Sequence, residues 1–259
     1  ANGEIPNLVN PRTGERNLFH DIAGPNMHTV VRHVIAPVTQ KAGGMSWALM
    51  RNPNGVPVDF FLSHSWNEGI FELYNRVISS WPSGMTGMWF CCTANPQSWG
   101  SSELSELIGR DPLVDSPFAK VLLARDTSGA PLVKRVLAIP NQAESIYGRL
   151  WCVAEAQLAM KVGIPVEIAR DRGPSAGGYQ MQTLIFVAEL LCVDFKSVRE
   201  AQCTSPEDEK RIREAISGEE DNIDCMIKML ADAGGFDPNR DAEQLSKLLP
   251  RNASKTRRL

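Results

Sequence analysis

The sequence predicts an α/β protein built on a doubly wound parallel sheet. Short, mainly apolar runs lie at residues 58–62, 85–93, 132–139 and 164–168, and the first three end abruptly in polar or turn-forming residues. Stretches with helical spacing separate the runs. Runs without polar alternation are typical of strands covered on both faces, and strands that alternate with helices form parallel sheets. We therefore expect these four runs to be the strands of one sheet.

The spacing of apolar residues predicts the helices. From Asn26 onward they recur at three- and four-residue steps, which predicts an amphipathic helix that is broken or ends near Pro37. Asn52 to Pro57 has the composition of a turn. The helical stretches between the expected strands are 68–80, 104–108, 118–124 and 146–162.

The C-terminal third carries clear helix signals. Ser205 and Pro206, followed by acidic residues, predict a helix start from which the helix runs to about Ile216. A second helix is expected from about Asp221 to Ala233, with Gly234 as its stop. The apolar run 181–193 fits either a helix or a strand.

These elements divide the chain into three parts. Residues 1–55 form an N-terminal arm and helix, and residues 56–170 form the α/β domain. Residues 171–259 form a strand and helix extension that we expect to pack on the same core, with a basic tail that frays over its last ten residues.

Composition excludes several classes of protein. The 259 residues are 43% hydrophobic and carry a formal net charge of −3, so we expect no general binding to nucleic acid. No apolar run reaches the roughly 18 residues of a membrane span. The six cysteines form no regular framework, which favours free thiols in a reducing, intracellular compartment and leaves import into an organelle open. The nucleotide-binding P-loop, GxGxxG and HExxH patterns are absent.

No metal site is expected. The histidines His28 and His33 lack the spacing of a zinc-binding helix, and no cluster of cysteines and histidines lies near them in the sequence. The adjacent pair Cys91 and Cys92 lies within an apolar run and is interpreted as two buried thiols.

Candidate ligand-binding residues lie where the predicted strands end. In an open α/β sheet, ligands bind beyond the carboxyl ends of the strands. The residues at these ends are Ser63, His64, Ser65 and Trp66 after the first strand, Asn95 and Gln97 after the second, and Asn141 and Gln142 after the third.

Glu155 is the candidate catalytic residue. Its neighbours in the helix 146–162 are nearly all apolar, and Trp151 stands four residues earlier on the same face. A carboxylate in such a helix must find a partner, shift its pKa or border a cavity. The alternative is that Glu155 lies on a narrow solvated stripe beside Gln157 and Lys161.

A second catalytic arrangement is weaker. His64 and Cys152 would form a nucleophilic pair if the first strand and this helix are neighbours. The alternative, which we favour, is a buried thiol and a histidine that is hydrogen-bonded to a loop. The stretch Gly44 to Ala48 only imitates a nucleophile elbow, because no strand precedes it.

Two motifs resemble those of the TIR (Toll/interleukin-1 receptor) domain family. Phe60-Phe61-Leu62-Ser63-His64-Ser65-Trp66 is followed about eighty-five residues later by Arg149-Leu150-Trp151-Cys152-Val153-Ala154-Glu155. The pair is most similar to divergent TIR-like proteins of protists, and the resemblance covers about residues 56–170. It implies a flavodoxin-like fold, and a role in signalling through self-association or protein partners.

The resemblance also implies an activity. Catalytic TIR domains cleave the nicotinamide–ribose bond of NAD+ with the glutamate of a W-x-x-x-E motif, which here is Glu155 with Trp151. NAD+ would then be a substrate, with no separate cofactor. Ser63, His64, Ser65 and Trp66 would hold the nicotinamide end, and Trp66 or Trp89 would stack on the pyridinium ring.

Three functional hypotheses follow. The chain is an NAD+ glycohydrolase or cyclase that uses Glu155, a non-catalytic TIR-like interaction module or subunit of a larger assembly, or an enzyme that cleaves the N-glycosidic bond of another nucleoside or nucleotide. The first and third require Glu155 to face Ser63–Trp66 across an open cleft, whereas the second predicts that side chains fill this cleft.

Overall fold

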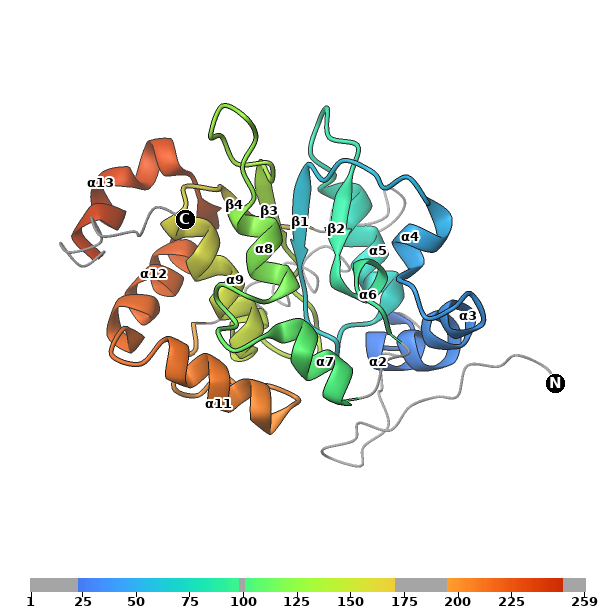
Figure 1. Cartoon of the computed structure of the whole chain (residues 1–259). Helices are drawn as coiled ribbons and strands as arrows, with labels where there is room; N and C mark the ends of the chain where they lie inside the picture. Colours follow the sequence, from blue (N-terminus) through green and yellow to red (C-terminus); the bar gives the residue numbers. More distant parts are fainter. Residues whose placement is uncertain (1–22, 98–100, 171–194, 249–259) are drawn as a thin grey trace, which may run out of the picture.

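A five-stranded, mostly parallel sheet forms the centre of the protein (Figure 1). The computed structural model describes residues 23–97, 101–170 and 195–248. The strand order is β2-β1-β3-β4-β5, where the first four strands are parallel and β5 is antiparallel to β4. The strands are β1 (Phe60–Ser63), β2 (Met88–Phe90), β3 (Arg135–Ala138), β4 (Val166–Ile168) and β5 (Gly235–Phe236). The predicted α/β class is confirmed, and the open sheet is compatible with a flavodoxin-like fold.

The apolar runs form strands whose side chains are buried on both faces of the sheet. All four residues of β1 are buried, and three of the four residues of β3 are buried. Helices cover both faces of the sheet, so neither face of a central strand needs polar side chains. The structured strands are shorter than the predicted runs, and the difference that changes the type of element is at β2, which ends at Phe90. Cys91 to Thr93, predicted as the end of the strand, belong instead to the short helix α6 (Cys91–Ala94).

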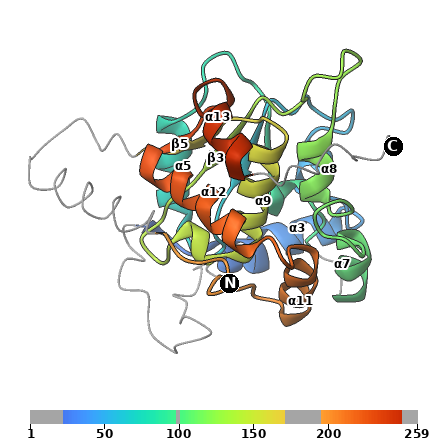
Figure 2. The ribbon, with the colours of Figure 1, turned by 90° about the vertical axis from the view of Figure 1, so that its left-hand side faces the viewer.

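Two helical layers enclose the sheet. Helix α5 (Ile70–Ser79) lies on one face, whereas α8 (Pro117–Leu123) and α9 (Leu150–Lys161) lie on the other (Figure 2). This arrangement follows from the right-handedness of parallel crossovers: the chain runs from β1 to β2 in one direction along the sheet, and from β2 to β3 and on to β4 in the other. Helix α9 packs on β1, β4 and α8. Nine of its twelve residues are buried, as its nearly uniform apolar sequence predicts.

The N-terminal helix continues past its expected break. Helix α2 (Met27–Val30) passes into a π-helical turn (Val31–Ile35) and then into α3 (Ala36–Lys41). The disturbance expected at Pro37 therefore takes the form of a wider turn ahead of the proline, and the helix ends at Lys41. The sequence analysis missed the short helix α4 (Trp47–Arg51), whose first turn is capped by the hydroxyl of Ser46.

The C-terminal part supplies helices and the edge strand. Helix α11 (Pro206–Ala215) starts at the predicted Ser205 cap. Helix α12 (Glu220–Ala233) ends at Gly234, whose φ of 65° is the left-handed conformation that glycine adopts readily. It packs on α9 and β5. The sequence analysis did not predict β5 and α13 (Pro238–Leu248).

Some predictions fall outside the described residues. The apolar run 181–193, the arm before residue 23 and the basic tail belong to this group. The remaining described helices are α7 (Ser101–Ile108) and a 3₁₀ turn (Ile146–Gly148) that precedes α9. In the described part of the chain, no helix is both long and apolar enough to cross a membrane.

Asp59 connects the start of β1 to the loop before β2 through hydrogen bonds. Its carboxylate accepts hydrogen bonds from the backbone N–H groups of Thr86 and Gly87, at 2.8 and 3.1 Å, and from Lys134 Nζ. The backbone hydrogen bonds, followed by that from Lys134, hold the pKa of Asp59 below its usual range. The ionised carboxylate therefore stabilises this end of the sheet.

We expect Asp59→Asn to lower stability near neutral pH and to have little effect in strong acid. A carboxylate with a lowered pKa contributes fully above its unfolded-state pKa of about 4, and its contribution is lost as the pH falls through the folded-state value. Urea unfolding of both proteins at about pH 7 and about pH 3 measures this. A constant difference across this range would contradict the assignment. Lys134→Gln, which removes only the exposed cation, should change stability far less.

Candidate functional site

A cavity of about 420 Å³ opens at the carboxyl ends of β1 and β2. This volume lies within the range of roughly 300–1,000 Å³ that is usual for small-molecule sites. Its walls come from α2, from the loop after β1, from α6 and the residues after it, from α7 and α8, from the first turns of α9 and from the start of α11. The lining residues include His64, Trp66, Cys91, Trp151, Glu155 and Arg149.

Glu155 lines this cavity from the second turn of α9. Its side chain is almost entirely buried, at 6% exposure, and its Oε2 accepts a hydrogen bond from Ser63 Oγ at 2.5 Å. Burial raises the pKa of Glu155 to about 8, although the Ser63 hydrogen bond opposes this shift. The carboxyl group is therefore mostly protonated at neutral pH, and it becomes a carboxylate when a cation or a higher pH favours the charged form.

The loop after β1 separates into residues that line the cavity and residues that support it. His64 and Trp66 line the cavity, whereas Ser63 lies behind Glu155 as its hydrogen-bond partner. The side chain of Ser65 contacts Glu144 instead of the cavity. Its hydroxyl donates to Glu144, and it is not part of the cavity wall among the described residues.

His64 pairs with Cys91 rather than with Cys152. The Nδ1 atom of His64 lies 2.6 Å from Glu68 Oε1, and its Nε2 lies 3.0 Å from Cys91 Sγ. Cys152 Sγ donates to the backbone oxygen of His64 at 3.4 Å, so the two residues are neighbours but their side chains do not form a nucleophile–base pair. Cys152 is a buried thiol, as the favoured alternative to a catalytic pair predicted.

Two tryptophans form aromatic walls. Trp151 stacks on Phe118 with ring centroids 4.7 Å apart, and Trp66 packs edge-on against His28 at 5.1 Å. Both indoles line the cavity. Trp89, the other aromatic residue considered for stacking on a ligand, is 7% exposed and stacks on Phe61 in the core. It does not reach the cavity wall formed by the described residues.

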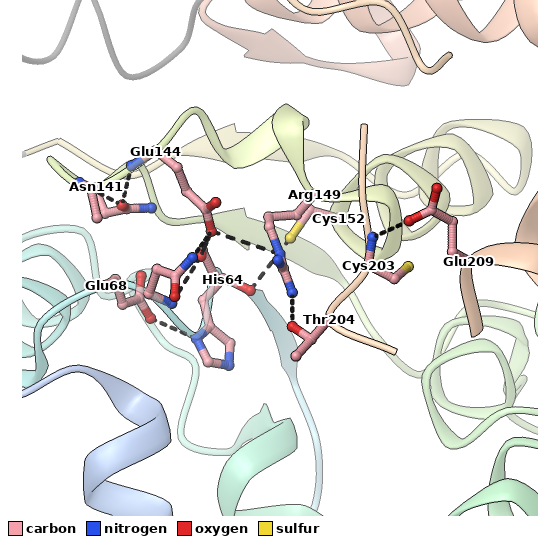
Figure 3. Close-up of polar contacts among 12 residues, drawn as sticks. His64, Glu68, Asn141, Glu144, Arg149, Cys152, Cys203, Thr204 and Glu209 are labelled. Carbon is pink, nitrogen blue, oxygen red and sulfur yellow. Dashed lines mark hydrogen bonds and ion pairs between the residues drawn. The ribbon is translucent and has the colours of Figure 1, made fainter. Parts of the chain in front are cut away.

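Arg149 adds a positive charge to the wall. Its Nη2 donates to Thr204 Oγ1 at 2.6 Å, and its Nε lies 3.7 Å from Glu144 Oε1 (Figure 3). Thr204 also lines the cavity, just before the cap of α11. The guanidinium is thereby held at the cavity wall, at the end formed by the start of α11.

The other strand-end residues divide in the same way. Asn95 and Gln97, after β2, line the cavity, and the side chain of Gln97 donates to the backbone oxygen of Cys91. Asn141 and Gln142, after β3, do not line it among the described residues. Asn141 is buried, and its side-chain oxygen accepts from the N–H groups of Ala143 and Glu144, so it shapes the loop.

Cys91 was not predicted to line a cavity, because the strand was expected to extend to Thr93. The strand-end rule would have selected Cys91 if the strand had been ended at Phe90. Arg149 belongs to the quoted motif, but nothing in the sequence indicated that its side chain reaches the start of α11. That contact joins residues more than fifty positions apart.

No protein-family model, curated protein or solved structure matches the chain significantly. The resemblance to TIR domains therefore rests on the two motifs alone and stays a prediction.

Proposed function

We propose that this protein cleaves the nicotinamide–ribose bond of NAD+ and that Glu155 is the catalytic residue. The observation that supports the proposal most strongly is the position of Glu155. The carboxyl group is buried on the wall of an open cavity that it shares with His64, Trp66 and Trp151. A titratable group with a strongly shifted pKa in such a cavity is typical of an active site.

The chemistry of the bond suits a single carboxylate. Nicotinamide leaves as a neutral base, so its departure needs no general acid. The positive charge that develops on the ribose is stabilised by a fixed negative charge, and this effect is strong where water is excluded. The carboxylate would then direct a water molecule, or a nucleophile within the substrate in the case of cyclisation, to the anomeric carbon.

A cationic substrate also explains how Glu155 becomes ionised in the active site. Burial raises the pKa of the empty site to about 8, which favours the neutral acid. A bound pyridinium ring carries a full positive charge, and a nearby opposite charge favours the carboxylate. Substrate binding would therefore generate the catalytic form of Glu155.

The remaining walls suit the other parts of a dinucleotide. Trp66 and Trp151 offer faces for a pyridinium or purine ring. Arg149 and Thr204 offer a guanidinium and a hydroxyl for the diphosphate. We propose these contacts as substrate-binding interactions, with Asn95 and Gln97 as further polar groups of the cavity wall.

The alternative function is a non-catalytic TIR-like interaction module that assembles with itself or with protein partners. This alternative predicts a cleft filled by side chains, and the cavity of about 420 Å³ beside Glu155 favours the enzyme instead. An enzyme that cleaves another N-glycoside would use the same cavity, and only the substrate distinguishes it.

The test is incubation of the purified protein with NAD+ and quantification of nicotinamide, ADP-ribose and cyclic ADP-ribose. We expect release of nicotinamide with one of the two ribose products in equal amount. Nicotinamide mononucleotide and unmodified nucleosides serve as competing substrates. Absence of nicotinamide release at every protein concentration, including those at which the protein self-associates, would contradict the proposal and favour the interaction module.

The pH dependence of catalysis follows from the ionisation of Glu155. Productive binding of NAD+ requires the carboxylate form, and burial raises the pKa of Glu155 in the free enzyme to about 8. We therefore expect kcat/KM for NAD+ to rise as the pH increases toward about 8 and to level off above it. A rate that is constant from about pH 6 to about pH 9, or that falls over this range, would contradict a catalytic carboxylate with a raised pKa.

A further inference from the structure

Two cysteine thiols and one imidazole nitrogen lie close together at the cavity wall. His64 Nε2 lies 3.0 Å from Cys91 Sγ and 3.6 Å from Cys92 Sγ, and the two sulfur atoms are 3.8 Å apart. All three residues are buried. They come from the loop after β1 and from α6, which begins where the neighbouring strand β2 ends.

We propose that His64, Cys91 and Cys92 bind a thiophilic divalent metal ion, of which Zn²⁺ suits these donors best. The proposal goes beyond the reaction proposed above and does not depend on it. Two thiolates and one imidazole form a donor set that zinc prefers, and three protein ligands that leave a fourth position open are typical of catalytic zinc sites.

The distances among the donor atoms are close to those of a tetrahedral site. With zinc–sulfur bonds of about 2.3 Å and a zinc–nitrogen bond of about 2.0–2.1 Å, two sulfurs lie ~3.8 Å apart and a sulfur and a nitrogen ~3.6 Å apart. The sulfur–sulfur distance of 3.8 Å and the Cys92–His64 distance of 3.6 Å match these values. Cys91 Sγ, at 3.0 Å from the ring, would move away by ~0.6 Å on binding.

Glu68 provides the carboxylate contact to the second ring nitrogen that metal-binding histidines commonly have. Its Oε1 lies 2.6 Å from His64 Nδ1, and its side chain is completely buried. A carboxylate on one ring nitrogen fixes the tautomer in which the other nitrogen carries the lone pair. That lone pair, on Nε2, faces the two sulfurs.

The charges of the buried cluster also favour a cation. Glu68, Cys91 and Cys92 are three acidic groups in a buried space where His64 is the base in direct contact. Burial of such groups is costly unless charges are compensated. Binding of a divalent ion would release two protons, one from the Cys92 thiol and the one shared by Cys91 Sγ and His64 Nε2. The ion then neutralises both thiolates.

The cavity gives the ion a route and an open coordination position. His64 and Cys91 both line the cavity, whereas Cys92 is fully buried behind them. An ion held by the three side chains is therefore reached from the cavity. Its fourth ligand would be a water molecule or a ligand that enters beside Glu155.

Cobalt substitution tests the site without reference to any enzymatic activity. The reduced full-length protein, stripped with a chelator, is titrated with Co²⁺. We expect one equivalent to produce thiolate-to-cobalt charge-transfer absorption and the intense visible bands of a tetrahedral ion, and we expect Zn²⁺ to abolish both. Absence of these bands in the wild-type protein would overturn the proposal.

Matched cysteine variants assign the bands. Cys92→Ser and Cys91→Ser should each weaken Co²⁺ binding at least about tenfold, since a thiolate ligand is lost. Cys152→Ser removes another buried thiol near His64 and should leave the spectrum unchanged, as should Cys203→Ser. Unchanged binding in both ligand variants would contradict the assignment.

X-ray absorption of the zinc-loaded wild-type protein covers the case in which a variant does not fold. We expect two sulfur neighbours at about 2.3 Å and one imidazole nitrogen at about 2.0–2.1 Å. A first shell of oxygen and nitrogen atoms alone would overturn the proposal.

Discussion

Glu155→Gln should reduce nicotinamide release from NAD+ by about 10²-fold or more, with little change in NAD+ binding. Glutamine keeps the size of the side chain and an oxygen that can accept the Ser63 hydrogen bond, but it cannot carry the negative charge that stabilises the ribose cation. Removal of one preorganised electrostatic group costs enzymes about this factor in kcat. Nicotinamide quantification under single-turnover conditions separates this loss from an effect on product release.

Stability measurements show whether such a loss reflects chemistry or misfolding. Burial raises the pKa of Glu155 to about 8, so the folded wild-type protein binds this proton more tightly than the unfolded chain. The stability of wild type relative to Glu155→Gln should therefore fall as the pH rises from the unfolded-state pKa of about 4.3 to about 8. Glu155→Gln lacks this loss and should be at least as stable as wild type at about pH 8.

The matched control for the charge is Glu167→Gln on β4. This carboxylate is paired with Arg135 and partly exposed, and it lies outside the cavity wall. Its removal should leave nicotinamide release within about twofold of wild type. The side chain does not line the cavity formed by the described residues, and an exposed ion pair contributes little to stability. Equal release from wild type and Glu155→Gln would remove Glu155 from the mechanism.

Trp151→Ala should lower kcat/KM for NAD+ by about 10- to 100-fold, mainly through a higher KM. The indole forms a cavity wall and stacks on Phe118 with centroids 4.7 Å apart. Stacking between an aromatic side chain and a base contributes ~1–3 kcal/mol. Because this contact holds substrate and transition state alike, its loss weakens binding more than it slows the chemical step. Steady-state kinetics at several NAD+ concentrations give both constants.

Trp81→Ala is the matched control for the loss of an indole. Trp81 packs edge-on against Phe60 at 4.9 Å, and it does not belong to the described wall of the cavity. Its replacement should affect stability while leaving KM near the wild-type value. A large rise in KM for Trp81→Ala, with none for Trp151→Ala, would contradict the placement of the substrate against Trp151.

The sheet was predictable because its central strands are short, apolar on both faces and separated by helices. The same logic failed at Cys91 and Cys92, since an apolar run does not distinguish a buried strand from a buried helical turn. Strand β5 has two residues, too few to produce a pattern, and it pairs with β4 through contacts far along the chain. Helix α13 begins at Pro238, a start signal that the sequence analysis did not use.

The candidate site was predictable only in part. The apolar neighbours of Glu155 indicated a buried carboxyl group, and the strand-end rule selected His64, Trp66 and the residues after β2. The hydrogen-bond partners of the two serine side chains after β1 were not predictable. The hydroxyl of Ser63 faces Glu155 whereas that of Ser65 faces Glu144, and only the turn of the backbone after β1 decides between them.

A crystal structure of Glu155→Gln with NAD+ tests the central claim most directly, because the impaired variant should retain the intact substrate. We expect the nicotinamide riboside to occupy the cavity, with its ring against Trp66 or Trp151 and its anomeric carbon facing the side chain of residue 155. NAD+ bound elsewhere on the protein, or a cavity that stays empty at saturating NAD+, would contradict the account.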